Sequence, residues 1–214
     1  MSDTTHLTLE KILVLEKQYR AAFINSLGGF KSVCLIGTKN KDSQTNLAIF
    51  NSIVHIGANP PLIGFVVRPD SVDRHTLQNI LETNYYTINH LNETIYKQGH
   101  QTAAHYPQSI SEFTATGLME EHKDNFLAPY VLQSNIKIGV EFKEKIDFII
   151  NGTIFIIGEI KHVYYPKNCL QPDGFLDLEK AGTLTCSGLD SYHITQKLAR
   201  LSYAKPNTTV TEIT

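Results

Sequence analysis

The segment "IDFIINGTIFIIGEIKHVYY", residues 146–165, constrains the fold of this chain more than any other. Two runs rich in β-branched and aromatic residues flank the pair Asn151-Gly152. Both central residues of a type I′ turn need positive φ, so Asn-Gly between two such runs is the strongest short signal of a β-hairpin. The segment therefore predicts a long antiparallel hairpin closed by a type I′ turn.

Other short apolar segments also carry strand chemistry and are bounded by turn residues. They are "SVCLIGT" at 32–38, "PLIGFVV" at 61–67 and "YYTINHL" at 85–91. Strands outnumber helices and are joined mostly by turns rather than by regular crossover helices. The sequence therefore predicts a mainly β fold, in which an antiparallel sheet closes into a barrel with flanking helices.

Two segments have helical periodicity. Apolar residues recur at helical spacing from Leu9 to Leu27, and Gly28-Gly29 then supplies a stop, so one amphipathic helix is expected over about residues 8–27. A second helix is expected within "SVDRHTLQNILETN", residues 71–84. Its expected apolar face is Leu77, Ile80 and Leu81, and its N-cap is Ser71 or Asp73.

The composition narrows the cellular context. The chain has 214 residues, of which 42% are apolar and 19% charged, and it lacks internal repeats and long linkers, so one domain over 1–214 is expected. The net charge of −2 provides no basic field for nucleic acid. No apolar run reaches the roughly 20 residues of a membrane span, and the amino terminus lacks the pattern of a signal peptide. We expect a cytoplasmic protein that binds neither nucleic acid nor membrane.

The cysteines and histidines do not form recognisable ligand patterns. Cys34, Cys169 and Cys186 are far apart and odd in number, which is typical of reduced thiols. The nine histidines show no HExxH or comparable spacing. The expectation is a protein without a metal site.

Polar residues interrupt the stretch "TNLAIFNSIVHIGANPPLIGFVVRP", residues 45–69. Its first strand begins polar and breaks at Asn51-Ser52, and its second ends on Arg68, where Pro69 stops the ladder. Arg74 follows at the start of the next helix. Two guanidinium groups and the free N–H groups of a helix start would form a site for a phosphate dianion. The alternative is that both arginines form surface ion pairs.

This stretch belongs to a longer series of motifs in the same order. With it, "RHTLQNI", "YTINHL", "QTAAHYPQSISEF", "DGFLDL", "GLDSYH" and "LARLSYAKP" resemble the flavin reductase-like proteins of the FMN-binding split-barrel superfamily. The resemblance covers roughly Tyr19 to Pro206. It implies an antiparallel, Greek-key-type split barrel that binds FMN.

The resemblance also implies which residues contact the cofactor. Residues near the isoalloxazine ring would be Thr45, Asn46, Leu47, Ala48, Asn51 and Ser52. Residues near the phosphate would be Arg68, Arg74, His75, Thr76 and Asn79. Asn89 is expected to face the same cavity, and Thr102 and His193 to border the flavin. Tyr192 would lie there too, although packing explains a tyrosine equally well. Arg200 or Lys205 could approach the reduced flavin, against the alternative that both lie in solvent.

Two functions follow from the resemblance. The first is an NAD(P)H-dependent flavin reductase, in which hydride passes from nicotinamide to FMN and then to free flavin, a ferric complex or a partner oxygenase. The second is an FMN-binding electron carrier, like flavoredoxins, without its own nicotinamide site; a pyridoxamine-phosphate oxidase-like reaction is a third option. No catalytic side chain is expected, because FMN carries the hydride chemistry. A homodimer that closes the flavin pocket is also implied.

Overall fold

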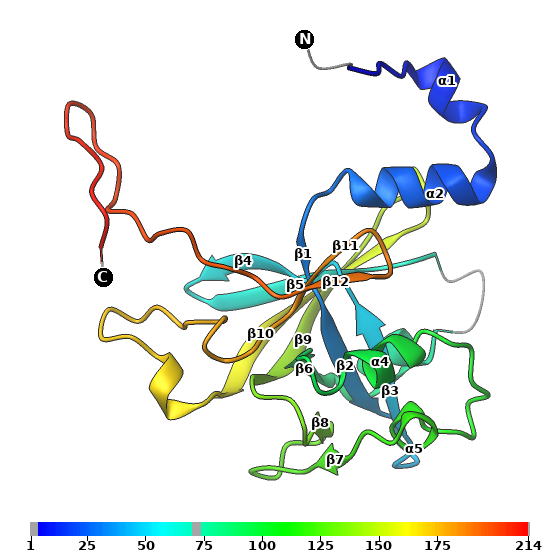
Figure 1. Ribbon diagram of the computed structural model, residues 1–214. Coiled ribbons are helices and arrows are strands. Elements are labelled where there is room, and N and C mark those ends of the chain that lie inside the picture. Colours follow the sequence, from blue (N-terminus) through cyan, green and yellow to red (C-terminus); the bar gives the residue numbers. More distant parts are fainter. Residues whose placement is uncertain (1–3, 70–73, 214) are drawn as a thin grey trace.

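The structure is a computed structural model that describes residues 4–69 and 74–213 (Figure 1). Its centre is a seven-stranded sheet in the order β3-β2-β6-β9-β10-β5-β4, and every ladder in it is antiparallel. The predicted mainly β, antiparallel fold is confirmed. The strands are β2 (Cys34–Lys39), β3 (Thr45–Phe50), β4 (Val54–Ala58), β5 (Pro61–Val67), β6 (Tyr85–His90), β9 (Lys137–Asp147) and β10 (Ile154–Tyr164).

Two smaller sheets accompany the large one. The first pairs β1 (Lys31–Ser32), β11 (Thr185–Ser187) and β12 (Ser191–His193), and the second pairs β7 (Glu120–Glu121) with β8 (Tyr130–Val131). The β1–β11 ladder joins segments far apart in the sequence, because Lys31 pairs with Cys186. This long-range pairing places β11 and β12 above the large sheet (Figure 1).

The helices are short. They are α1 (Leu9–Leu13), α2 (Lys17–Ser26), α3 (His75–Thr83), α4 (Tyr96–Gln101) and α5 (Glu112–Thr116), with a 3-10 turn, η1, at Lys167–Cys169. Among the residues that the structure describes, no helix is long and apolar enough to cross a membrane.

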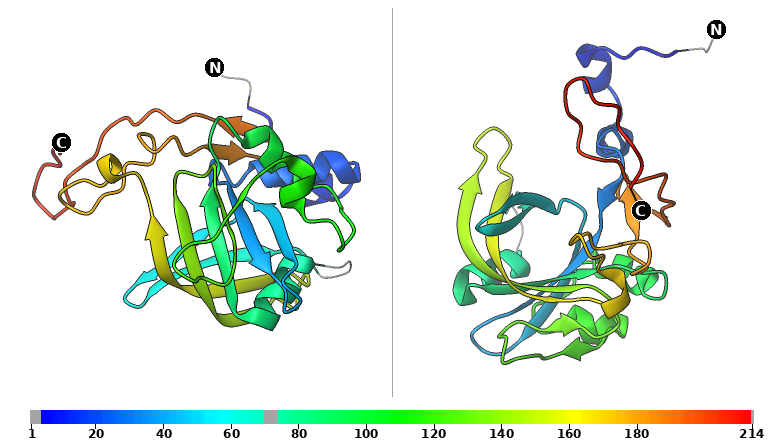
Figure 2. Two further views of the ribbon diagram at one scale, coloured as in Figure 1. Left: turned by 90° about the horizontal axis from the view of Figure 1, so that it is seen from below. Right: turned by 90° about the vertical axis from the view of Figure 1, so that its left-hand side faces the viewer.

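Both faces of the central strands are buried. The large sheet curls (Figure 2), and the residues on its inner side pack around Phe65, Tyr86 and Ile156 together with Leu77 and Ile80 of α3. The outer-face residues are Val33, Leu35 and Leu47, which pack with Phe113 of α5, Val131 of β8 and Cys186 of β11. Because alternate residues of a strand point to opposite faces, β2 reads as a continuous apolar run rather than an alternating one.

The predicted second helix is α3. Leu77 and Ile80 are buried as expected, but Leu81 is 44% exposed and does not belong to the buried face. Ser71 and Asp73, the expected N-caps, lie outside the described residues. The helix ends at Asn84, which adopts the left-handed conformation with φ 64°.

The long hairpin predicted around Asn151-Gly152 is confirmed as β9 and β10, but the predicted turn type is wrong. Of the two, only Gly152 has positive φ, at 71°, whereas a type I′ turn needs two such residues. Its N–H instead donates to the carbonyl of Phe148 at 2.8 Å, in a loop whose ends are joined by the Phe148 N–H and the Thr153 carbonyl, also at 2.8 Å. The loop is therefore longer than two residues.

The single helix predicted over residues 8–27 is two helices, α1 and α2. The chain leaves the helical path between them, and the Glu16 side chain accepts hydrogen bonds from the N–H groups of Gln18 and Tyr19 as the N-cap of α2. Neither helix contains a buried residue. The apolar spacing was correct for a helix, but a capping carboxylate in the middle of the pattern divides it.

Candidate functional site

One cavity of about 830 Å³ collects most of the polar residues that the sequence singled out. Its wall is built from β3 and the residues after it, the end of β5, the start of α3, the α4–α5 loop and the β11–β12 turn, with Asn25 of α2 at its margin. Volumes of this size are typical of sites that bury a cofactor or another small molecule. The cavity is therefore the candidate functional site.

The β3 strand lines this cavity with a free sheet edge, because β3 is the outermost strand of the large sheet on this side. Hydrogen-bonded and non-hydrogen-bonded pairs alternate along an antiparallel ladder. The Asn40 N–H bonds to the Gln44 carbonyl at the β2–β3 turn. Counting from that pair, Leu47 and Ile49 turn their N–H and C=O groups away from β2. Ile49 therefore presents backbone donors and acceptors along the cavity wall.

Glu112, from α5, binds the edge of β3 at Leu47. Its carboxylate accepts the N–H of Leu47 at 2.9 Å, and the residue is 6% exposed. Burial raises the pKa of this carboxyl, while its backbone hydrogen bonds and the nearby His75 act in the opposite direction. Glu112 therefore accepts a backbone hydrogen bond from the β3 edge and also lines the cavity.

Positive charge gathers at the end of the cavity formed by β5 and α3. Arg68 directly follows β5, and Arg74 precedes His75, the first residue of α3. The Arg74 guanidinium donates to the carbonyl of Pro69 at 3.2 and 3.3 Å. This contact is with a backbone carbonyl rather than a carboxylate, so its charge remains uncompensated by that partner. Two guanidinium groups and the start of a nine-residue helix form an anion-binding arrangement.

The start of β3 is tied to the same end. The Asn46 amide donates to the Thr76 hydroxyl at 3.0 Å, and both side chains are buried. At the far end of the strand, Ser52 exchanges hydrogen bonds of 3.1 Å with the N–H and C=O of Val66. These bonds hold β3 and β5 on adjacent sides of the cavity.

The structure brings most of the predicted site residues to the cavity. Those in its wall are Asn46, Ala48, Asn51, Ser52, Arg68, Arg74, His75, Thr76 and Thr102. Those that it places elsewhere are Thr45, Leu47, Asn79, Asn89 and His193. The predicted residue Tyr192 also lies in the wall.

The displaced residues have structural partners. The hydroxyl groups of Thr45 and Ser111 lie 3.0 Å apart, and the Asn79 amide donates to the Thr38 hydroxyl at 3.1 Å. Thr45 and Asn79 both line a smaller adjacent hollow. The Leu47 side chain is fully buried. His193 bonds to Ser187 at 2.9 Å.

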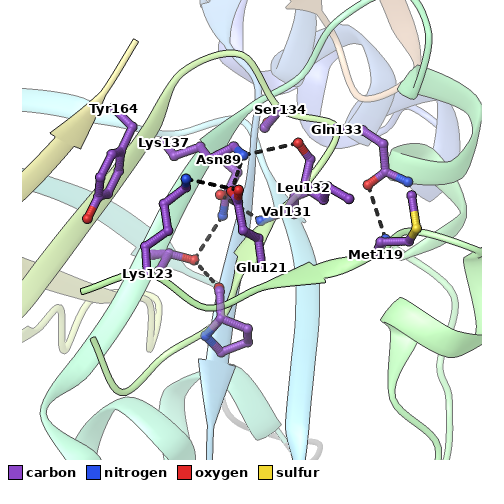
Figure 3. Close-up of polar contacts among 12 residues, drawn as sticks. Asn89, Met119, Glu121, Lys123, Val131, Leu132, Gln133, Ser134, Lys137 and Tyr164 are labelled. Atoms are coloured by element: carbon purple, nitrogen blue, oxygen red, sulfur yellow. Dashed lines mark hydrogen bonds and ion pairs between the residues drawn. The ribbon is translucent and has the colours of Figure 1, made fainter. Parts of the chain in front are cut away.

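The expectation that Asn89 faces the cavity is wrong. Asn89 is fully buried, donates to the Leu35 carbonyl at 3.1 Å and the Thr87 hydroxyl at 2.9 Å, and accepts the Val131 N–H at 2.9 Å. Figure 3 shows it within a polar cluster that also contains Val131 and the ion pair of Lys137 and Glu121. Every hydrogen-bonding atom of its side chain is used to join β2, β6 and β8, so it acts structurally.

The suggested approach of Arg200 or Lys205 to the flavin is not met either. Arg200 pairs with Asp173 and lies over the Phe175 ring, 4.1 Å from its centroid. These contacts fix the carboxyl-terminal arm to the 170s loop, away from the cavity wall. Lys205 is exposed in the same arm.

Four further cavity residues were not predicted individually. Cys186 and, within the "GLDSYH" motif, Leu189 and Asp190 reach the wall through the β1–β11 ladder, and Asn25 reaches it from α2. Cys186 is a free, buried thiol, like Cys34 and Cys169. Pairing across 155 positions cannot be read from local patterns, so only the adjoining "GLDSYH" motif pointed to this region. Among the described residues no cluster of three metal-ligating side chains occurs.

A curled antiparallel sheet whose edge strand, arginine pair and helix start surround one cavity defines a split-barrel protein with a cavity suited to an anionic small molecule. The sequence pattern of the flavin reductase like domain matches residues 30–179. The chain belongs to this flavin reductase-like family, as the motifs predicted.

Solved structures agree with this assignment. A provisionally assigned flavin reductase with a split barrel domain from Shewanella frigidimarina NCIMB 400 superposes with a TM-score of 0.91 at 51% identity, over 94% of this chain and 100% of that one. Nitrilotriacetate monooxygenase component B from Bacillus cereus superposes with a TM-score of 0.81 at 16% identity, over 94% and 100% of the two chains. The second likeness concerns the fold alone.

A curated relative from Aquifex aeolicus, an uncharacterised protein, is 25% identical over 103 residues, which are 47% of this chain and 53% of the relative. The chain thus spans about half the length of this relative. Family and fold together establish a flavin reductase-like split barrel.

Proposed function

We propose that the protein binds FMN in the cavity and acts as an NAD(P)H-dependent flavin reductase that passes electrons to an acceptor. The observation that carries this proposal is the pairing, around one cavity of about 830 Å³, of a free β3 edge with the Arg68 and Arg74 end. FMN has the matching chemistry, because its ring carries a polar edge and its tail ends in a phosphate dianion. The donor set of the cavity therefore fits this group.

Each part of the wall has a distinct task. Arg68, Arg74 and the N–H groups at the start of α3 hold the phosphate by charge-assisted hydrogen bonds. The backbone of Ile49 and the side chains of Asn51 and Ser52 hydrogen-bond the polar edge of the ring. Glu112 keeps the β3 edge in place through the Leu47 N–H.

Bound FMN would supply the hydride and electron chemistry itself. The protein contributes orientation, exclusion of water and a fixed electrostatic environment, since holding reacting atoms about 3–3.5 Å apart provides much of the rate enhancement. This chemistry requires no nucleophilic side chain of the protein.

The protein works with partners. A second copy of the chain closes the open side of the cavity, and a small nicotinamide dinucleotide is the reductant. A partner oxygenase is one acceptor class; the likeness to nitrilotriacetate monooxygenase component B supports it, since that protein is a component of a monooxygenase.

The test is to mix the FMN-loaded protein anaerobically with NADH or NADPH and to measure the absorbance of the oxidised flavin at about 450 nm. Bleaching, and subsequent turnover with free FMN or ferric citrate, is the expected result. If neither nucleotide bleaches the flavin while dithionite does, and the reduced protein then passes electrons to an acceptor, the protein is an electron carrier like flavoredoxins instead.

A further inference from the structure

The cavity has a second end, away from Arg74 and the start of α3. Strand β3 runs between the two ends: Asn46 bonds to Thr76, two residues after Arg74, at one, and Asn51 bonds to the Gly188 carbonyl at 3.0 Å at the other. Five residues of extended strand span about 16 Å. The cavity is therefore long enough to hold ligand groups at both ends.

The residues of this second end come from three separate elements. They are Asn25 of α2, His100 of α4, and Leu189, Asp190 and Tyr192 of the β11–β12 hairpin. We name this region the Asp190 end. Figure 1 shows α2 and the β11–β12 hairpin next to each other above the large sheet.

Hydrogen bonds hold the Asp190 end in place. The Lys31 ammonium donates to the carbonyls of Asn25 at 3.2 Å and Gly188 at 3.0 Å, and so joins α2 to the β11–β12 turn. The Tyr192 hydroxyl and the His100 Nδ1 lie 2.7 Å apart. Burial, with Cys186 and Asp190 nearby, raises the pKa of Tyr192 to about 12, so this hydroxyl stays protonated at neutral pH.

The two ends differ in charge. Arg74 lines the first, whereas Asp190 places a carboxylate in the wall of the second. The Lys31 ammonium, which joins α2 to the β11–β12 turn, already bonds to two carbonyls. A carboxylate accepts hydrogen bonds from hydroxyl groups and repels phosphate, so the Asp190 end suits a ligand group with hydroxyls.

We propose that the Asp190 end binds the ribose of the reductant and makes the protein selective for NADH over NADPH. A carboxylate that accepts hydrogen bonds from ribose hydroxyls is the common device for binding NADH, whereas a 2′-phosphate needs a cation in its place. The inference rests on the proposed reductase function and names its reductant. The carboxylate disfavours the 2′-phosphate of NADPH by about ten-fold or more in affinity, as expected for like charges at a partly solvated site.

Binding of the oxidised nucleotides tests this selectivity without turnover. The FMN-loaded protein is titrated by calorimetry with NAD⁺ and with NADP⁺, and the two dissociation constants are compared. We expect NADP⁺ to bind at least about ten-fold more weakly than NAD⁺. The variant Asp190→Asn removes the charge and keeps the shape; in it the ratio should fall to about three-fold or less, mainly because NADP⁺ binds better.

Two controls make the result specific. Asp147→Asn removes the same charge from an exposed site beside Lys145 in the β9 strand and should leave the ratio unchanged. If Asp190→Asn loses its thermal unfolding transition, Asp190→Ser replaces it, because the side chain is exposed and serine is tolerated in turns.

The outcomes separate this inference from the function beneath it. The inference is overturned if the unaltered protein binds NAD⁺ and NADP⁺ equally well, or if the ratio of the two dissociation constants is unchanged in the Asp190 variants. Reduction of the flavin by either reduced nucleotide still upholds the reductase function in that case. If neither reduced nucleotide bleaches the flavin and neither oxidised form binds, both are overturned together.

Discussion

The side-chain amide of Asn51 donates a hydrogen bond of 3.0 Å to the backbone carbonyl of Gly188, 137 positions away. Asn51 lies just beyond the end of β3, and Gly188 lies in the turn between β11 and β12. The bond therefore connects the large sheet to the small one across the cavity wall. It is reinforced by Lys31, which donates to the same carbonyl at 3.0 Å.

Removing the Asn51 amide should increase the mobility of the β11–β12 hairpin while changing the stability of the whole protein little. In Asn51→Ala, we expect hydrogen exchange to increase in residues 187–192 and FMN affinity to fall by about ten-fold, because one hydrogen bond contributes roughly 1 kcal/mol and the wall also loses a ligand contact. Asn135→Ala is the matched control, since its amide bonds to the Ala181 carbonyl at 2.9 Å outside the cavity. Equal effects of the two variants on FMN would contradict the role of Asn51.

Arg74 should matter for FMN and little for stability. Within the part of the chain that the structure describes, its guanidinium hydrogen-bonds only the backbone carbonyl of Pro69, so Arg74→Ala should lower the free energy of unfolding by less than about 1 kcal/mol. FMN affinity should fall by about ten-fold or more, because charge-assisted bonds to phosphate are strong. Fluorescence titration with FMN and with riboflavin measures the effect, which should be absent for riboflavin.

The control for this variant is Arg200→Ala, which removes an arginine paired with Asp173 away from the cavity. It should leave FMN affinity unchanged. Simultaneous loss of flavin and of the thermal transition in Arg74→Ala would show instead that Arg74 is structural.

The close packing of β2 against the β8 segment depends on Gly37. A Cβ at this position would lie 2.4 Å from the Pro129 carbonyl oxygen, a backbone atom that cannot move aside easily. Gly37→Ala should therefore destabilise the protein by about 1–3 kcal/mol in urea unfolding. Gly57→Ala in edge strand β4, where the nearest atom is 3.4 Å away, should cost much less. Similar losses in both variants would refute this explanation.

Local sequence patterns predicted the elements better than their ends. The runs around Asn151-Gly152 correctly indicated a hairpin, because β-branched residues on both sides of a glycine favour it. The turn type failed because Asn-Gly also suits a longer loop in which Gly152 alone needs positive φ. Glu16 likewise divided the amino-terminal helix by capping its second half, which helical spacing of apolar residues does not reveal.

The candidate site was predictable where it is local. Asn46, residues 48–52, Arg68 and residues 74–76 all line one cavity, and the resemblance to the family implied a common site for most of them. Asp190 and Cys186 come to the same wall through the β1–β11 ladder, which sequence patterns do not specify. Asn89 was misplaced because a polar residue within an apolar strand has the same appearance whether it faces a ligand or a buried structural network.

The protein should lose stability in mild acid through His90. Burial lowers the pKa of this histidine from 6.5 to about 4 in the folded state. Between these two values the unfolded chain binds more protons than the folded one, so the free energy of unfolding falls as the pH is lowered from 6.5 to 4. The contribution of this side chain is at most about 3 kcal/mol, since each pKa unit corresponds to about 1.4 kcal/mol.

Urea unfolding between pH 7 and pH 4 (roughly the window of histidine titration) measures this dependence. His90→Gln keeps a polar group for Thr183, which lies 3.1 Å from the ring Nδ1, and should flatten the dependence. The exposed His55, replaced by glutamine, should leave it unchanged. A profile for His90→Gln as steep as that of the unaltered protein would exclude His90 as its source.

The last prediction is that the protein forms a homodimer with a flavin site near its interface. Helices α1 and α2 contain no buried residue within one chain, yet large apolar side chains lie on them and at their C-caps: Val14 is 83% exposed, Tyr19 63% and Leu27 64%. Exposed apolar side chains gathered on neighbouring elements mark interaction surfaces. Asn25 of α2 lies in the cavity wall, so a second copy docked on this helix would also cover the cavity.

Because only the paired form would bind flavin well, the affinity for FMN should fall on dilution below the dimer dissociation constant. Sedimentation velocity of the FMN-loaded protein is the direct measurement. The double variant Val14→Ser, Leu27→Ser should shift it toward the monomer, while Ile149→Ser at the tip of the β9–β10 hairpin, where the side chain is 98% exposed, serves as a matched control. A single species at the monomer mass of 24.0 kDa that still retains its flavin would overturn the prediction.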